Sequence, residues 1–251
     1  MVKIKSVLVS QPKPETDKSP YYDIAKKYNV KIDFRPFVKV EGIPSKDFRT
    51  QKINLADYMS VIFNSRHGVD HYFRMCDELR VPVNDNRKYF CISESIAFYL
   101  QKYVTYRKRK IFYGNGTLAN LMQQVQKFPE DKYLVPLSDV HKQDIPEKLA
   151  EANIAYDIAV LYRTVSSNMS DMETLGHDIV LFFSPAGVMS LKQNFPNFNQ
   201  EEENVFIGAF GPTTAETVEK LGYRLDIKAP TADNPSMPAA LEKFIKAQNG
   251  K

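Results

Sequence analysis

The chain has 251 residues, of which 43% are hydrophobic and 25% are charged, the composition of an ordinary soluble globular protein with one large or two smaller domains. Cys76 and Cys91 are the only cysteines, which argues against a disulfide framework and a zinc ribbon. The N-terminal apolar run is too short for a signal peptide, and no segment approaches the roughly 20 apolar residues of a membrane span. We therefore expect a cytoplasmic protein with no membrane partner.

The net charge of +4, from 34 basic and 30 acidic residues, is mild. The densest basic run, residues 107–110, has no interleaved aromatic residues and belongs to no recognised nucleic-acid-binding module. A solvated approach to a strand explains this run better. No nucleic-acid partner is therefore expected, and nucleic-acid binding is the least favoured alternative. A moderately basic surface would also suit a small polyanionic substrate.

Short apolar runs alternate with helical patterns along the whole chain. In the first half, a helix is expected at 21–28 and strands are expected at 6–10, 30–37, 60–63, 89–92 and 110–113. In the second half, strands are expected at 133–137, 154–160, 178–183, 205–210 and 223–227. Continuous apolar strands between helices indicate parallel sheets covered on both faces. Five strands per half fit two flavodoxin-like α/β domains.

The sequence also contains a weak internal duplication. Residues 61–69 resemble residues 180–188, which pairs Ser65 with Ser184 at a separation of 119 positions. Two further matches occur in order: Ala97 pairs with Ala215, and Asn29 pairs with Asn153. Their separations, 118 and 124 positions, are nearly the same. The chain is therefore interpreted as two copies of about 120 residues that begin near residues 6 and 132.

The turns that follow the strands deserve most scrutiny, because ligands bind at the carboxyl ends of parallel strands. These turns are rich in Ser, Thr, Asn, Gly and Pro, which helix caps also require, and free amides at helix starts attract anions. No phosphate-binding glycine loop and no nucleophile elbow is present. His67 and His71 lack a third ligand, so we expect His67 in a turn, His71 on a partly exposed helix face, and no metal or other cofactor.

Five segments together resemble the uroporphyrinogen-III synthase family. They are Val-Ile-Phe-Asn-Ser-Arg at 61–66, Leu-Tyr-Arg-Thr-Val at 161–165, Phe-Phe-Ser-Pro-Ala-Gly at 182–187, Gly-Pro-Thr-Thr-Ala at 211–215, and the Ala-Pro-Thr to Pro-Ser-Met stretch at 229–237. Each match is weak alone, but they follow the family's order and span nearly the entire chain. The resemblance implies two flavodoxin-like parallel-sheet domains joined by a two-stranded β-ladder. It places domain 1 at 1–36 plus 167–251, domain 2 at 43–158, and the linkers at 37–42 and 159–166.

The resemblance also implies a reaction. The family converts the linear tetrapyrrole hydroxymethylbilane to uroporphyrinogen III, with inversion of the last ring, called ring D, and loss of water. Such a lyase of tetrapyrrole and haem biosynthesis needs no cofactor, and its site must mainly position a flexible polycarboxylate. By resemblance, Tyr162 is the catalytic candidate, because a phenol is protonated at neutral pH and can donate to the departing hydroxyl. An alternative role for Tyr162 is to cap the edge of the linker strand.

The substrate's eight carboxylates call for several hydrogen-bond donors. The candidate binding residues are Asn64, Ser65, Arg66, Ser95, Lys142, Ser184, Gly211, Thr213 and Thr214. One position departs from the family, since its threonine in the second turn of domain 2 aligns with Ile96, which has no hydroxyl. An alternative reading is therefore a non-catalytic two-domain protein of the same fold that binds small anions. A monomer is expected in either case.

Overall fold

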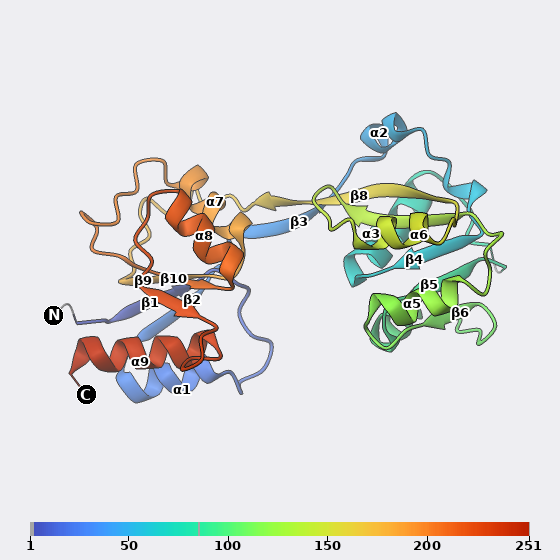
Figure 1. Ribbon diagram of the computed structural model, residues 1–251. Coiled ribbons are helices and arrows are strands. Elements are labelled where there is room, and N and C mark those ends of the chain that lie inside the picture. The colour runs from blue at the N-terminus through green and yellow to red at the C-terminus, as the bar shows by residue number, and fades with distance from the viewer. Residues whose placement is uncertain (1–2, 85, 251) are drawn as a thin grey trace. The chain divides into compact units, whose positions relative to one another are not determined.

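The computed structural model describes residues 3–84 and 86–250 (Figure 1). Residues 1, 2, 85 and 251, which fall within the predicted domains, lie outside the described part. Its contacts divide the chain into unit 1, Met1–Lys39 with Val165–Lys251, and unit 2, Val40–Thr164. The chain passes from one unit to the other within strands β3 and β8.

Unit 1 is built on a parallel sheet with the strand order β11-β10-β9-β1-β2. Helices α1 and α9 cover one face of this sheet, and α7 and α8 cover the other (Figure 1). Its elements are β1 (Ser6–Val9), α1 (Pro20–Tyr28), β2 (Lys31–Phe34), β9 (Ile179–Phe182), α7 (Pro185–Asn194), β10 (Phe206–Phe210), α8 (Pro212–Lys220), β11 (Ile227–Ala229) and α9 (Met237–Asn249).

Unit 2 has a six-stranded sheet with the order β3-β8-β7-β4-β5-β6. Buried residues of α3 and α4 pack on one face of this sheet, and those of α5 and α6 pack on the other. Its elements are β3 (Val38–Gly42), α2 (Ser45–Phe48), the 3-10 turns Arg49–Gln51 and Leu55–Asp57, β4 (Ser60–Phe63), α3 (Arg66–Glu78), β5 (Lys88–Cys91), α4 (Glu94–Leu100), β6 (Ile111–Tyr113), α5 (Leu118–Val125), β7 (Tyr133–Ser138), α6 (Asp144–Glu151) and β8 (Tyr156–Ser166).

The predicted fold class is confirmed. Strands β3 and β8 are neighbours in the sheet. Two backbone bonds next to them have the pattern of an antiparallel pair: Ile43 N donates to Leu161 O at 2.9 Å, and Ser167 N donates to Phe37 O at 2.9 Å. These two strands form the expected two-stranded ladder, and the other strand pairs are parallel with helices on both faces. Parallel strands buried on both faces explain the continuous apolar runs of the sequence.

The duplication is visible in the topology. The order β11-β10-β9-β1-β2 of unit 1 matches β6-β5-β4-β7-β8 of unit 2, so each sheet combines strands from both copies. The paired asparagines Asn29 and Asn153 both adopt the left-handed conformation, with φ of 52° and 55°. In both copies the residue after this asparagine donates its amide back into the helix, Val30 to Ala25 O and Ile154 to Leu149 O. Because only a few residue types tolerate this conformation, the asparagine match has a structural cause.

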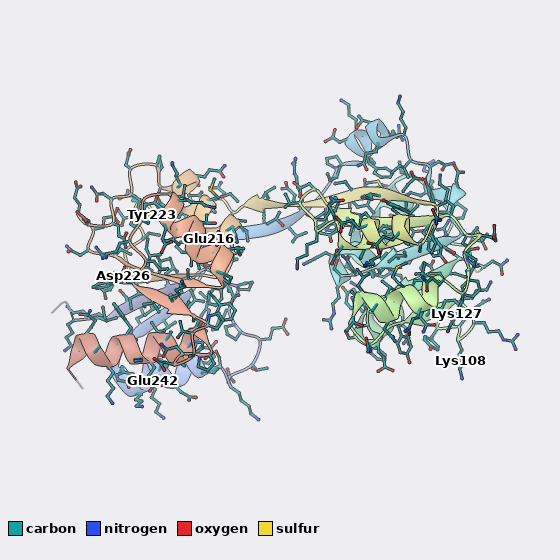
Figure 2. The ribbon with its side chains drawn as sticks, in the orientation of Figure 1. Lys108, Lys127, Glu216, Tyr223, Asp226 and Glu242 are labelled. Carbon is teal, nitrogen blue, oxygen red and sulfur yellow. The ribbon has the colours of Figure 1, made fainter. Side chains whose placement is uncertain are left out.

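One strand prediction is wrong. Residues 223–226 form a connection, and β11 begins at Ile227, where the predicted strand ended. Side-chain hydrogen bonds hold this connection: Gln200 Nε2 donates to Arg224 O at 2.9 Å, and Asp226 Oδ2 accepts from Ile207 N at 2.9 Å. Tyr223 and Asp226 mark its two ends in Figure 2. An apolar sequence pattern does not reveal that backbone groups form hydrogen bonds with side chains distant in sequence instead of with a neighbouring strand.

The close packing of β10 generates a stability prediction. A Cβ at Gly208 would lie 2.4 Å from Leu181 Cδ2 and 3.3 Å from Ile227 Cβ, on the two neighbouring strands. We expect Gly208→Ala to lower the free energy of unfolding by about 1–3 kcal/mol, because overpacking a buried strand forces its neighbours apart. Urea denaturation measures this change. The exposed neighbour Lys228→Ala is the control, and an unchanged midpoint for Gly208→Ala would contradict the packing described here.

Candidate functional site

A β-bulge on β8 sets the position of Tyr162. In the pairing of β7 with β8, Leu137 faces Val160 and Ser138 faces Tyr162, so Leu161 is an extra residue on β8. Strict alternation would place Leu161 and Tyr162 on opposite faces, but both are buried in the same cluster, at 0% and 8% exposure. A bulge that re-aims a side chain in this way is common next to active sites. Because of the bulge, residues 160–165 do not alternate regularly between the two faces of the sheet.

The phenol of Tyr162 meets the start of α3. Its Oη lies 3.0 Å from Ser65 Oγ, and Ser65 Oγ also accepts from Gly68 N at 2.9 Å as the helix cap. Burial raises the pKa of Tyr162 above its usual value, and the hydrogen bond with Ser65 opposes part of this shift. Tyr162 is therefore a neutral phenol throughout the physiological pH range, as a proton donor must be.

His71 lies beside the same phenol. Its ring stacks on that of Tyr162 with centroids 5.2 Å apart and an angle of 19° between the planes. Burial lowers the pKa of His71, and the charges of Arg74 and His67 add to this effect against the opposing charge of Asp70. Arg74 Nε donates to His71 Nδ1 at 3.2 Å, so the neutral imidazole carries its proton on Nε2.

Arg74 also ties this pair to the bulge. Its Nη2 donates to Ile43 O at 2.8 Å and to Leu161 O at 3.2 Å, and its other terminal nitrogen pairs with Glu78. The bulged carbonyl of Leu161 thus accepts from both Arg74 and the backbone of Ile43. The guanidinium of Arg74 therefore contacts both the bulge next to Tyr162 and the imidazole of His71, which stacks on the Tyr162 ring.

The other predicted residues of unit 2 lie at the same carboxyl edge of the sheet. Arg66 is the first residue of α3, with its guanidinium carbon 5.2 Å from the centroid of the Tyr99 ring, and Asn64 Oδ1 is buried without a partner in the described part of the chain. Ser95 Oγ lies 2.9 Å from Ser93 Oγ at the start of α4, and Lys142 is exposed in the connection after β7. Of the predicted set, Ser65 and Tyr162 are the pair in direct contact.

Ile96 has a packing role. It is 7% exposed and belongs to the cluster that contains Tyr162. It also occupies the third helical position of α4, which corresponds to Thr214 at the third position of α8. Thr214 is 2% exposed, so both positions face inward. An isoleucine therefore fits a position that the fold buries in both copies.

In unit 1 the predicted residues lie at two neighbouring strand ends. Ser184 caps α7 by accepting from Gly187 N at 3.2 Å, as Ser65 does in the other copy. Gly211 precedes α8 with φ of 91°, a conformation that favours glycine, and it has no side chain to cap the helix. The first helical amide bond comes from Ala215, so the amides of Thr213 and Thr214 point out of the helix start. Thr213 is exposed and Thr214 is buried.

The sequence did not predict that His71 and Arg74 would lie beside the candidate residue Tyr162 and its strand. The spacing of His67 and His71 is visible in the sequence, but the stacking of His71 on Tyr162 depends on the bulge of β8, which the local sequence does not reveal. His67, expected in a turn, is the second residue of α3, with its ring centroid 6.0 Å from that of Tyr162. Within residues 3–84 and 86–250, no group of three His, Cys, Asp or Glu side chains is arranged to hold a metal ion, and no helix is long and apolar enough to cross a membrane.

Comparisons with known proteins agree on one family. The family described as "Uroporphyrinogen-III synthase HemD" matches residues 21–239. A protein of Methanocaldococcus jannaschii, named provisionally as a uroporphyrinogen-III synthase, is 24% identical over 233 residues, which cover 87% of this chain and 90% of that protein.

Solved structures show the same fold. The crystal structure of uroporphyrinogen-III synthetase from Helicobacter pylori aligns over 97% of this chain and 100% of its own, with a TM-score of 0.57 and 15% identity. That of a mutant uroporphyrinogen III synthase from Thermus thermophilus aligns over 98% of this chain and 100% of its own, with a TM-score of 0.50 and 17% identity. Since the family match spans most of the sequence, the chain belongs to the uroporphyrinogen-III synthase (HemD) family.

Proposed function

We propose that this protein is an active uroporphyrinogen-III synthase, a lyase that closes hydroxymethylbilane to uroporphyrinogen III with inversion of ring D and loss of water. Family membership gives the reaction class, and the neutral, buried phenol of Tyr162 at hydrogen-bond distance from Ser65 is the observation that supports catalysis most directly. The two units are proposed to be the two domains, with boundaries at 1–36 plus 167–251 and 43–158 and linkers at 37–42 and 159–166. The protein is proposed to act as a cytoplasmic monomer.

Tyr162 is proposed to donate a proton to the departing hydroxyl of the bilane. The hydroxyl then leaves as water, and the terminal pyrrole becomes an azafulvene by losing its N–H proton. Return of a proton to the phenolate restores Tyr162, so one water is released in each turnover. Ser65 supports this role when it donates to Tyr162 Oη, because the phenol's own proton is then free for the substrate.

The remaining predicted residues are proposed to bind carboxylates. In unit 2 the set consists of Asn64, Ser65, Arg66, Ser95 and Lys142. In unit 1 the free amides of Thr213 and Thr214 at the start of α8 are suited to an anion, and Ser184 and Gly211 shape the two turns. The exposed hydroxyl of Thr213 can reach a ligand, whereas the buried Thr214 is proposed to contribute mainly through its amide.

The proposed activity is tested by incubating the protein with freshly prepared hydroxymethylbilane and separating the product isomers by chromatography after oxidation to porphyrins. We expect the type III isomer to predominate and to form faster than the spontaneous cyclisation. Only the type I isomer at the spontaneous rate would contradict the proposal. That outcome would favour the alternative, a non-catalytic anion-binding protein in which Ile96 marks a loss of activity.

Removal of the phenol hydroxyl tests the role of Tyr162. We expect Tyr162→Phe to reduce kcat at least tenfold, since general-acid assistance contributes about 10²- to 10⁴-fold. Steady-state formation of uroporphyrinogen III measures the effect. Tyr156→Phe removes a hydroxyl from the same strand away from this site and serves as the matched control. Equal rates for Tyr162→Phe and the unmodified protein would show that the hydroxyl departs without this phenol.

A further prediction concerns how the protonation of His71 makes the free energy of unfolding depend on pH. Because its pKa is lowered in the folded protein, the folded chain binds fewer protons than the unfolded chain between the two pKa values. The free energy of unfolding should therefore fall as the pH drops below the unfolded value of about 6.5 and continue to fall until His71 is protonated in the folded state.

NMR titration of the imidazole, assigned with His71→Gln, measures this pKa directly. Arg74→Gln removes a neighbouring charge and should move the pKa of His71 upward. A pKa at or above the ordinary histidine value in the unmodified protein would contradict the described environment.

A further inference from the structure

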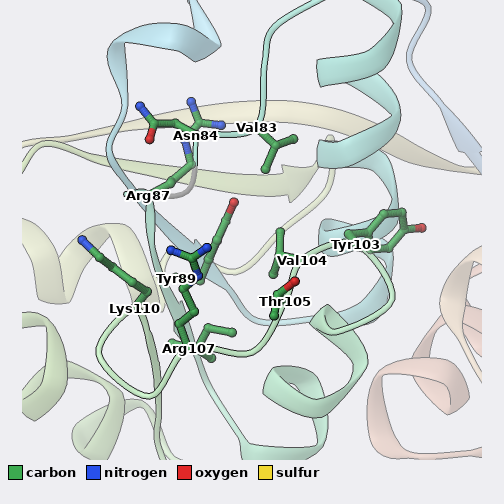
Figure 3. A pocket seen from close by; sticks show the side chains of 10 residues that line it. Val83, Asn84, Arg87, Tyr89, Tyr103, Val104, Thr105, Arg107 and Lys110 are labelled. Atoms are coloured by element: carbon green, nitrogen blue, oxygen red, sulfur yellow. The ribbon is translucent and has the colours of Figure 1, made fainter.

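A second polar pocket lies at the opposite edge of the sheet of unit 2. Arg87 immediately precedes β5 and Lys110 immediately precedes β6, whereas the candidate site follows the ends of the strands. The pocket has a volume of about 210 Å³. Side chains from three segments surround it: the approach to β5, the stretch after α4 and the approach to β6 (Figure 3).

Arg87 is the unusual member of this pocket, because its side chain is 2% exposed yet positively charged. Its Nη1 donates to Tyr72 Oη at 2.5 Å and its Nη2 donates to Leu55 O at 3.3 Å. Its Nε is buried and has no hydrogen-bond partner among the described residues. Buried charges are normally paired, and an uncompensated one is strongly destabilising.

Among the described residues, the groups that contact Arg87 supply no negative charge. Burial raises the pKa of the Cys76 thiol and of the Tyr72 phenol above their usual values, so both are neutral at physiological pH. No carboxylate of the described residues pairs with Arg87. The guanidinium therefore lacks a counter-charge in the described part of the protein.

Further donors line the same pocket. Lys110 adds an ammonium group whose Nζ donates to Asn86 O at 3.1 Å, a neutral acceptor. The amide oxygen of Asn84 accepts from Asn86 N at 2.8 Å, which leaves its NH₂ group as a donor, and Thr105 adds a hydroxyl. Val83 and Val104 provide apolar wall beside these groups.

We propose that this pocket binds a phosphoryl group, either free phosphate or the phosphate of a small ester, with Arg87 and Lys110 as its main ligands. Donors from several directions suit the tetrahedral arrangement of phosphate oxygens, and a dianion would offset the charges of Arg87 and Lys110, two of the three cationic side chains that line the pocket. The pocket is distinct from the candidate site around Tyr162, and the proposal does not depend on the catalytic activity.

Calorimetric titration of the full chain with inorganic phosphate and with phenyl phosphate, at an ionic strength held constant with chloride, tests the proposal. One saturable site per chain is expected. Tighter binding of phosphate would identify the free ion as the ligand, and tighter binding of phenyl phosphate would identify an ester. Lys110→Gln should weaken binding about tenfold, since a charge-assisted hydrogen bond is lost. Lys108→Gln removes the same charge two residues away, outside the pocket, and should leave binding unchanged (Figure 2).

Arg87 is followed without substitution, because replacing a buried arginine could unfold the protein. Its ¹⁵Nε–H resonance should shift on titration with phosphate and saturate with the calorimetric dissociation constant. The absence of saturable binding, or an unmoved Arg87 resonance, would overturn the proposal. Binding of phosphate or of a short oligonucleotide would also overturn the proposal if Lys108→Gln and Lys110→Gln weakened it equally. That result would indicate a diffuse basic surface.

Discussion

The extra residue on β8 is the feature on which the candidate active site depends. Without the bulge at Leu161, the alternation of a strand would place Tyr162 on the face opposite the Leu161 side chain, away from Ser65 and His71. The carbonyl of the bulged residue, Leu161, accepts from the backbone of Ile43 next to β3 and also from Arg74. Arg74 comes this close because residue 42 is glycine: a Cβ there would lie 2.8 Å from Arg74 Cζ. Backbone geometry, one arginine and one glycine together fix the phenol.

The duplication explains why strand ends with similar sequences have different chemistry. The equivalent serines Ser65 and Ser184 both cap a helix through a glycine amide. The serine of unit 2 also lies next to a tyrosine hydroxyl, because β8 carries a bulge beside it. The second pair of equivalent turns, which precede α4 and α8, differs in another way. Ser93 bonds to Ser95 and Gly211 has no side chain, so neither caps its helix, and the free amides of α8 suit anion binding.

Much of the fold could be predicted because its signals are local or periodic. Buried parallel strands give continuous apolar runs, and the asparagine pair at 29 and 153 reports a backbone conformation that few residues accept. The prediction of a strand at 223–227 was wrong because the side chain of Gln200, distant in sequence, bonds both the amide and the carbonyl of Arg224. That the candidate residues of each unit share one edge of its sheet could be predicted, since parallel strands place their carboxyl ends at the same edge.

The partners of Tyr162 were not predictable in the same way. The contacts of His71 and Arg74 with β8 join residues about 90 positions apart, and they exist only because the bulge turns Tyr162 toward α3. The burial of Thr214 and Ile96 was likewise hidden, because the same helix-start position can face a ligand or the core. A threonine-to-isoleucine difference that suggested lost function therefore has a packing explanation.

In the proposed reaction, Tyr162 and Ser65 act as one hydrogen-bonded unit in forming uroporphyrinogen III. A double-mutant cycle of Tyr162→Phe and Ser65→Ala, measured as the rate of type III isomer formation, tests it most directly. If the pair acts together, the double variant should be little slower than Tyr162→Phe alone. Effects that multiply independently would contradict the claim, because they would mean that the two hydroxyls contribute separately.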